Sequence, residues 1–309
     1  MGQTNFDVVQ ANQFIGGVLP AQSPFGRVFF VDNTNGSDGN TGRSPRKALQ
    51  TIAAAITAAS SGLAGLGDTI VIAPGTYTIT AALVPTAHTI FRAAVFNARR
   101  PSVIITGNIA DLLQVDVDGC QFHGLEIKAS GATADNLVDV ADGANVDGLA
   151  FNGCVFNGAD QTSVIALNAS DATFILTRLS VVNSLFRDLT GTCINIGAKG
   201  FAYSYIACNQ FAIDVNSGVG IALADTTAFA TGKGYVIEHN VFTGFDATAD
   251  EVGITIAGTE DTTGAGIIRN NYFAYLAPAA VTIDKLSKSE INNYYGDAAT
   301  GGTLVDPGT

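Results

Sequence analysis

Short stretches along the chain place a small or polar residue between two aliphatic ones. Seven such triplets follow one another: Val115-Asp116-Val117, Val138-Asp139-Val140, Ile165-Ala166-Leu167, Ile194-Asn195-Ile196, Ile221-Ala222-Leu223, Ile254-Thr255-Ile256 and Val281-Thr282-Ile283. A period of two is typical of a β-strand that buries one face, and helical periodicity is absent from this part of the chain. One strand per repeat, with a coil returning each time, predicts strands that stack in parallel.

A second pattern places an aromatic residue two positions after a Cys, Ser or Asn. The first position is occupied in turn by Cys120, Cys154, Ser184, Asn209, Asn240, Asn271 and Asn293, and the aromatic position by Phe122, Phe156, Phe186, Phe211, Phe242, Phe273 and Tyr295. Successive aromatic residues are 34, 30, 25, 31, 31 and 22 positions apart. Irregular repeats of this length predict a solenoid. The polar column would form an internal stack at a turn, with the aromatic column stacked beside it.

Together the two patterns predict an all-β fold, a single-stranded right-handed parallel β-helix, because right-handed crossovers are strongly preferred. Equivalent residues of neighbouring coils would lie about 4.8 Å apart. We expect an N-terminal arm over residues 1–25, a cap of strand, loop and helix over 26–67, the β-helix over 68–296 and a tail over 297–309.

The expected cap is an amphipathic helix at the N-terminal end of the solenoid. Ser44 and Pro45 are typical of a helix N-cap and first helical position. One helical face carries five apolar residues: Leu49, Ile52, Ala53, Ile56 and Ala59. Such a helix would cover the apolar bore and the unpaired strand edges that a β-helix exposes at its end.

The stretch from the first strand to the first full coil resembles the pectate-lyase-like superfamily of right-handed parallel β-helices. The resemblance rests on five pieces of sequence: Val31-Asp32, Gly36 to Gly42, Ala48 to Ile52, Gly67 to Ile70 and Pro74-Gly75-Thr76-Tyr77. It covers about residues 28 to 80, and the coil pattern covers the rest. The superfamily includes polysaccharide lyases and hydrolases, phage tailspikes and non-catalytic virion proteins. The resemblance is therefore specific for fold and nearly silent on activity.

The charge and hydropathy of the chain exclude some classes of binding partner. The chain has 309 residues, a net charge of −12, only 14% charged residues and a mean hydropathy of +0.29. The negative charge argues against nucleic acid, and no apolar run is long enough to span a membrane. A chain this apolar is expected to bury side surface through lateral self-association.

The cysteines and histidines predict packing rather than a metal or cofactor site. None of the four cysteines shows CxxC spacing, and a stacked Cys120–Cys154 disulfide is the alternative to free thiols. His88 and His123 lack clustered partners, whereas Glu238-His239 is a weak acid/base candidate. Reduced thiols and no visible signal peptide predict synthesis in a cytoplasm.

Acidic residues on the outward columns are the candidate chemical site. The first outward column reads Asp116, Asp139, Ala166, Asn195, Ala222, Thr255 and Thr282, and the next reads Asp118, Ala141, Asn168, Gly197, Ala224, Ala257 and Asp284. These residues are short, and no Arg, Lys or aromatic platform accompanies them. Asp116, Asp118 and Asp139 are expected within about 5 to 7 Å of one another. Such carboxylates could serve a retaining glycosidase or hold Ca²⁺; solvated surface acids are the alternative.

The N-terminal and C-terminal segments of the chain favour a protein that assembles with other subunits. The apolar residues of the N-terminal arm (Phe6, Val8, Val9, Phe14 and Ile15) are expected to dock on a neighbour or partner, or to cover a side of the β-helix. After Tyr295 the short tail leaves no room for a C-terminal trimerisation domain of the kind that long tailspikes carry.

These features predict a non-enzymatic structural protein of a tailed bacteriophage virion, made in the host cytoplasm. The specific expectation is a homotrimeric capsid decoration protein that contacts the major capsid protein or another virion protein, and that needs no cofactor. The alternative is a phage tailspike or a polysaccharide-degrading β-helix enzyme that acts on a bacterial glycan.

Overall fold

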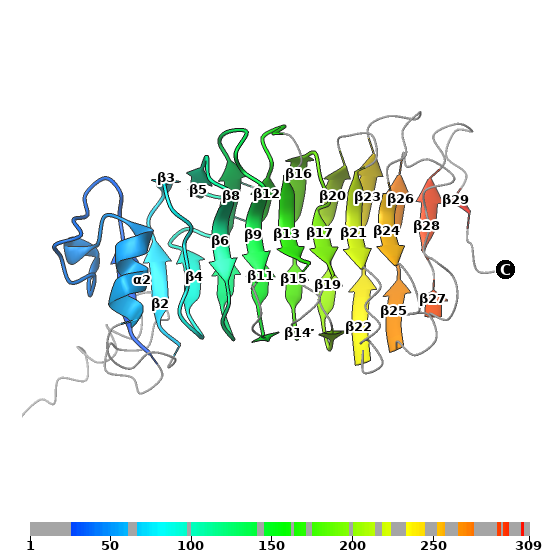
Figure 1. Cartoon of the computed structure of the whole chain (residues 1–309), viewed down its shortest axis with the longest axis horizontal. Helices are drawn as coiled ribbons and strands as arrows, with labels where there is room; N and C mark the ends of the chain where they lie inside the picture. Colours follow the sequence, from blue (N-terminus) through cyan, green and yellow to red (C-terminus); the bar gives the residue numbers. More distant parts are fainter. Residues whose placement is uncertain are drawn as a thin grey trace, which may run out of the picture.

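The chain winds into a right-handed parallel β-helix, as its sequence predicts (Figure 1). The computed structural model describes residues 26–60, 67–97, 100–140, 145–161, 164–170, 175–197, 200–213, 218–223, 233–244, 252–256, 265–274, 289–291, 293–296 and 304–305. Two long sheets and two shorter ones run along the helix axis. Each coil contributes one strand to each sheet it reaches.

Sheets A and B are the two long sheets, and each has ten strands. The strands of sheet A are β1 (Val28–Val31), β2 (Thr69–Ile72), β4 (Ile90–Ala93), β7 (Gln121–His123), β11 (Ala150–Asn152), β15 (Ser180–Val182), β19 (Tyr205–Ala207), β22 (Lys233–Glu238), β25 (Ala265–Arg269) and β27 (Ser289–Ile291). Those of sheet B are β3 (Gly75–Ile79), β5 (Val103–Gly107), β8 (Leu125–Ala129), β12 (Val155–Asn157), β16 (Leu185–Leu189), β20 (Gln210–Ile213), β23 (Val241–Gly244), β26 (Tyr272–Ala274), β28 (Tyr294–Gly296) and β29 (Leu304–Val305). All the pairs are parallel except β28 with β29.

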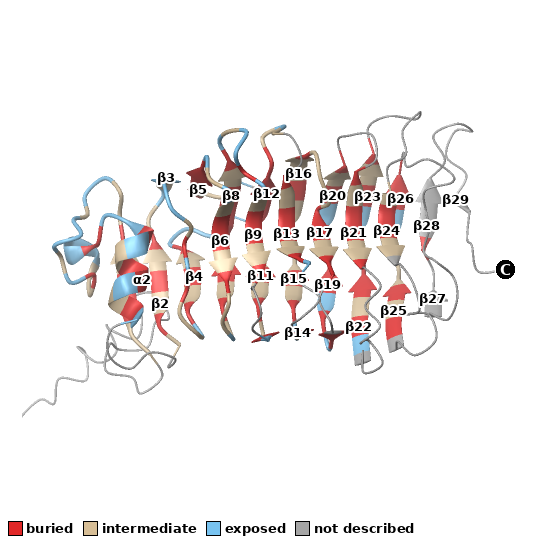
Figure 2. Cartoon of the chain, viewed as in Figure 1, coloured by how far each residue is buried: buried red, intermediate tan, exposed pale blue. Residues whose placement is uncertain are grey.

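Sheet C has six strands and sheet D has three. Sheet C consists of β6 (Asp111–Val115), β9 (Asn136–Val140), β13 (Ile165–Ala169), β17 (Ile194–Ile196), β21 (Val219–Leu223) and β24 (Val252–Ile256). Sheet D consists of β10 (Val146–Asp147), β14 (Ile175–Thr177) and β18 (Gly200–Ala202). The buried positions recur at the same place on successive coils (Figure 2), so the core is a continuous column.

Two separate phenylalanine stacks fill this core. Phe91, Phe122 and Phe151 stack along sheet A with ring centroids 4.9 and 5.0 Å apart. Along sheet B, centroids 4.6 to 4.9 Å apart join five rings: Phe156, Phe186, Phe211, Phe242 and Phe273. The rings of Phe151 and Phe156 meet edge to face at 5.3 Å and join the stacks.

The predicted aromatic column was therefore right for sheet B and wrong at its first member. Phe122 pairs with Phe151, on the strand before the one that carries Phe156. The sequence pattern merged the two stacks because each has an inward aromatic residue shortly after a turn: Phe122 follows the turn before sheet A, and Phe156 follows the turn before sheet B. At the other end of the column Tyr295 pairs with Phe273 in the backbone register.

The polar column exists as an internal ladder at the corner between sheets A and B. Backbone N–H groups donate to the side chain of the next coil, from Cys154 to Ser184 and from Ser184 to Asn209. The ladder continues through three further asparagines (Asn240, Asn271 and Asn293). Cys120 was wrongly placed in this column: its carbonyl accepts from Ala150 N, so it precedes sheet A instead.

The cap helix begins later than predicted. Residues Pro45–Lys47 form only a 3₁₀ turn, and the Ser44 side chain makes no capping bond. Helix α2 spans Ile52–Ser60, and its N-cap is Thr51, whose hydroxyl accepts from Ala54 N at 3.1 Å. The buried face is Ile52, Ala55, Ile56 and Ala59, whereas the predicted Ala53 is exposed. The helix packs against β1 and β2, as expected of a plug.

The predicted boundary between cap and β-helix at residue 68 does not separate two structural units. Strand β1, in the predicted cap, already pairs with β2 as the first strand of sheet A.

Several residues named in the sequence predictions lie outside the described residues. They are the arm residues Phe6, Val8, Val9, Phe14 and Ile15 and the outward positions Ala141, Ala224, Ala257, Thr282 and Asp284. Within the described part of the chain, no helix is long and apolar enough to cross a membrane.

Candidate functional site

The predicted acidic cluster rests on a register that the structure does not have. Asp139 lies opposite Gln114, not opposite Asp116. In β13 the residue opposite Asp139 is Asn168, and Ala166 is buried. Strands β6, β9, β13 and β21 each bury two consecutive residues before the outward one, which simple alternation does not anticipate.

The three carboxylates consequently have different surroundings. Asp116 follows β6 and accepts from Gln114 Nε2 at 3.1 Å. Asp118 lies in the turn that leads to sheet A and accepts from Asp147 N at 2.8 Å. Asp139 accepts from Asn168 Nδ2 at 3.1 Å on the outer face of sheet C. The expected compact triad is wrong, although a role for the single carboxylates stays a prediction.

The outer face of sheet C instead carries hydrogen-bonded amides. Asn168 joins Asp139 to Asn195, whose Nδ2 donates to Asn168 Oδ1 at 3.0 Å. Another pair lies nearer the N-terminal end, where Asn136 Nδ2 donates to Asp111 Oδ1 at 2.7 Å. These side chains bond to one another, which leaves fewer donors and acceptors for a ligand. Among the described residues no group of three or more His, Cys, Asp or Glu side chains could hold a metal ion.

A groove of about 950 Å³ runs along the corner between sheets A and B. Its lining residues are Phe96, Asn152, Asn183, Ser184, Leu185, Cys208, Asn209, Gln210, His239 and Val241. At this corner each coil turns through one residue with positive φ: 53° at Asn183, 58° at Cys208 and 55° at His239. This left-handed conformation makes the chain turn sharply, and these three side chains are exposed.

Two members of the polar ladder, Ser184 and Asn209, line the groove, and the ladder continues beneath it. Asn240 Oδ1 accepts from both the backbone N–H and the side-chain amide of Asn209, each at 3.0 Å, and its own Nδ2 donates to Ile206 O at 2.9 Å. Because the ladder joins successive coils from Cys154 to Asn293, the exposed side chains beside it are held at the strand spacing of about 4.8 Å. The groove is therefore preorganised.

An exposed aromatic ring closes the N-terminal end of the groove. Phe96 is 56% exposed, and its ring lies over Gly124, where an added Cβ would come within 2.7 Å of the ring. Gly124 also has a φ of 67°. Glycine at this corner both permits the turn and seats the ring, and it leaves the other face of Phe96 open to solvent.

A charged cluster on sheet A lies beside the far end of the groove. Glu238 is 7% exposed and accepts from Tyr205 Oη at 2.7 Å and from Arg269 Nε at 2.5 Å. The hydrogen bond from Tyr205 lowers the pKa of Glu238, Arg269 lowers it further, and burial opposes both. The same bond raises the pKa of Tyr205 to about 12. The predicted partner His239 is farther away, with Nδ1 3.8 Å from Glu238 Oε2.

This cluster makes stability depend on pH. Because the folded-state pKa of Glu238 is lowered, its ionised form stabilises the fold above the unfolded-state pKa of about 4.3, and this contribution is lost as pH falls through the folded-state value. We expect a Glu238→Gln variant to lose about 1–2 kcal/mol of unfolding free energy at pH 7 and to approach the wild type near pH 3. Denaturant unfolding between pH 3 and 7 measures this, with Tyr205→Phe as an intermediate case. An equal difference at all pH values would contradict the assignment.

The remaining cysteine, histidine and arginine candidates contact neighbouring side chains or are buried in the core. All four cysteines are free, and burial raises the pKa of the Cys120 and Cys154 thiols to about 11. His123 is partly buried, and its Nε2 lies 3.2 Å from Gln121 Oε1. Arg187 forms ion pairs with Glu126 at 3.2 Å and with its neighbour Asp188 at 3.9 Å.

Sequence reasoning missed the groove. Phe96 and Asn152 belong to no repeated motif, and Gln210 is the variable residue between Asn209 and Phe211; the three come together only when the coils stack. One signal was present in the sequence. Glycine precedes the ladder position Cys154, but side chains that a turn does not require precede the next three positions: Asn183, Cys208 and His239.

Known structures share the fold of this chain. The Aspergillus niger pectin methylesterase is 16% identical, with 90% of this chain and 91% of that chain covered and a TM-score of 0.50. The pectin methylesterase PemA from Erwinia chrysanthemi is 12% identical, with 88% and 90% covered and a TM-score of 0.52. A mutant of the PL6-family alginate lyase AlyGC is 13% identical, with 87% of this chain but only 39% of that chain covered and a TM-score of 0.52.

No protein-family model matches the sequence, and no curated protein matches it. At these identities the structural neighbours establish the parallel β-helix fold alone. The neighbours described are pectin methylesterases and an alginate lyase.

Proposed function

We propose that this protein binds an extended glycan along the groove at the corner between sheets A and B. The observation that carries the proposal is the groove itself, which has a volume of about 950 Å³, an exposed aromatic ring at one end and exposed polar side chains along its length. A glycan chain would lie parallel to the helix axis, so that successive sugars meet successive coils.

The residues that line the groove can bind both the hydroxyl groups and the apolar C–H face of a sugar. Asn152, Asn183 and Gln210 offer amide donors and acceptors to hydroxyl groups, and none of the lining residues is an Asp, Glu, Lys or Arg. Phe96 offers an apolar face on which the C–H face of a pyranose can pack. Because the asparagine ladder already holds the corner, little ordering entropy is lost on binding.

The structural neighbours support this class of ligand and not the main sequence-based prediction. Carbohydrate-active enzymes share the fold, which favours the alternative that the sequence left open, a β-helix protein acting on a glycan. Binding without cleavage is proposed because the described groove lining contains no pair of carboxylates. The virion location, the homotrimer and the capsid partner stay predictions.

The test is a glycan array followed by titration calorimetry of the full-length protein with the best oligosaccharide. We expect Phe96→Ala and His239→Gly each to weaken binding about tenfold, a loss of about 1.4 kcal/mol. Glycine is chosen at position 239 because its positive φ would strain alanine.

Asn195→Ala, on the outer face of sheet C, is the matched control and should bind like the wild type. Equal weakening by the control, or no binding to any glycan, would overturn the proposal. Release of reducing ends or unsaturated sugars from the bound glycan would overturn its non-catalytic part.

A further inference from the structure

The sheet B side of the groove continues one coil beyond the residues that line it. Val241, which lines the groove, lies opposite Tyr272 of β26 in the parallel register. The rings of Phe242 and Phe273, the residues that follow them, stack in the core. Because side chains alternate between the two faces of a strand, Val241 and Tyr272 both face outward. Tyr272 is 40% exposed, so an accessible aromatic ring extends the surface of the groove.

The corner side of the groove continues in the same direction. Asn270 has a positive φ of 54°, close to the 55° of His239 on the coil before it. His239 N donates to Arg269 O at 3.3 Å, which places the two corner residues on neighbouring coils. The side chains also meet, since Asn270 Nδ2 lies 3.4 Å from His239 Nε2. Both sides of the groove therefore reach the coil that carries Tyr272.

The side chain of Tyr272 is not part of the core. Its neighbours on the strand are buried: Asn271 belongs to the polar ladder and Phe273 to the sheet B stack. The Tyr272 hydroxyl makes no hydrogen bond to another of the described residues. The exposed ring and the hydroxyl can therefore both contact a ligand.

Two exposed aromatic rings thus mark opposite ends of the corner. Phe96 lies over Gly124, and Tyr272 lies on the coil of Asn270. The corner passes through one residue with positive φ on each coil: Gly124, Gly153, Asn183, Cys208, His239 and Asn270. The five coil spacings between the first and the last of these amount to about 24 Å. Only an extended glycan of at least this length can touch both rings.

We propose that Tyr272 is a second sugar-stacking platform, and that the groove selects long glycans that rest one sugar on Phe96 and another on Tyr272. The inference rests on the proposed glycan binding and adds the length of the ligand. Tyrosine suits this role because it combines an apolar ring with a polar hydroxyl group. Once one ring holds the glycan, contact with the other becomes intramolecular, which raises the affinity for a chain that reaches both.

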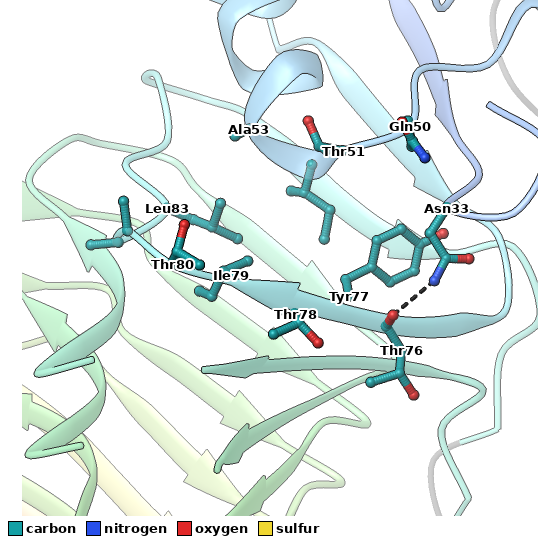
Figure 3. A pocket seen from close by; sticks show the side chains of 13 residues that line it. Asn33, Gln50, Thr51, Ala53, Thr76, Tyr77, Thr78, Ile79, Thr80 and Leu83 are labelled. Carbon is teal, nitrogen blue, oxygen red and sulfur yellow. Dashed lines mark hydrogen bonds between the residues drawn. The ribbon is translucent and has the colours of Figure 1, made fainter. Parts of the chain in front are cut away.

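A second pocket lacks such a platform. It has a volume of about 370 Å³ and lies between β3 and the first turn of α2, where Asn33 Nδ2 donates to Thr76 O (Figure 3). The aromatic residue in its lining is Tyr77, which is buried and whose hydroxyl donates to Ala73 O at 2.9 Å. No exposed ring face is therefore offered to a sugar among the residues that line this pocket.

Titration calorimetry of the full-length protein with a length series tests the inference. The probes are the oligosaccharides, from the disaccharide upward, of the glycan that binds most tightly on the array. We expect the affinity of the wild type to rise with length until the glycan spans about 24 Å. Tyr272→Ala should weaken binding of the longest probe about tenfold and leave the disaccharide nearly unaffected. Tyr272→Phe keeps the ring and should retain most of the affinity.

Two variants away from the groove are the controls, and both should bind every probe like the wild type. Tyr203→Gly removes a tyrosine that is 62% exposed at the corner between sheets D and A, where glycine suits the positive φ. Thr78→Ala alters the pocket beside β3, and weaker binding by this variant would overturn the inference.

The series also separates failure of the inference from failure of the proposed function. Equal affinity of the wild type for all lengths would overturn the inference alone. The same holds if Phe96→Ala weakens binding of the longest probe but Tyr272→Ala does not. Binding of no oligosaccharide by the wild type would overturn the proposed function, and the inference with it.

Discussion

Replacing Phe211 with alanine is expected to lower the free energy of unfolding by about 3–5 kcal/mol, the usual cost of removing a buried aromatic side chain. Phe211 is fully buried, and its ring stacks on Phe186 and on Phe242 with both centroid distances 4.6 Å. The variant loses both ring contacts and leaves a cavity in the middle of the sheet B stack. The two neighbours cannot close this cavity, because their strands are held at the sheet spacing.

Denaturant unfolding measures this effect, and Phe96→Ala provides the control. Phe96 is a phenylalanine of the same size that is 56% exposed, so its removal should cost less than about 1 kcal/mol. The two variants should also separate in function, since Phe96→Ala is expected to weaken glycan binding. Similar stability losses for both would contradict the stack as the main source of core stability.

Replacing Asn240 with alanine is expected to cost about 3 kcal/mol. Its side chain bonds to Asn209 N, Asn209 Nδ2, Ile206 O and Asn271 Oδ1, each at 2.9 or 3.0 Å. Buried hydrogen bonds contribute about 1 kcal/mol each, and a buried donor without a partner costs about 1–3 kcal/mol. In this variant the backbone N–H of Asn209 would lose its ladder acceptor.

The matched control for Asn240 is Asn183→Gly. Asn183 is an exposed asparagine at the same corner, and its contact with Asn152 is 3.4 Å long. Glycine suits its positive φ, so less than about 1 kcal/mol should be lost. If Asn240→Ala were as stable as this control by thermal or denaturant unfolding, the ladder could not be a structural element of the corner.

The fold was predictable because the solenoid repeats its environments. Every coil presents the same turn to the same neighbours, so Asn209, Asn240 and Asn271 recur in the sequence as they recur in space. The prediction failed at Cys120 and Phe122, where the repeat was counted from a similar motif at the other end of sheet A. A motif of four residues cannot distinguish two turns that both precede an inward aromatic residue.

The candidate site was less predictable than the fold. Placing Asp116 opposite Asp139 required strict alternation, but sheet C buries Leu112 and Leu113 together and shifts the outward position to Gln114. The groove depends on Phe96, which precedes the first repeated motif and reaches the corner only by packing over Gly124. Contacts of this kind come from tertiary structure and leave no periodic signal.

The most direct test of the account is a crystal structure of the protein with the oligosaccharide that binds most tightly on the array. We expect the sugars to lie along the corner groove, with one ring over Phe96 and hydroxyl groups bonded to Asn183 and His239. Sugars on the outer face of sheet C, over Asp139 and Asn168, would contradict the account and favour the site first predicted from the sequence.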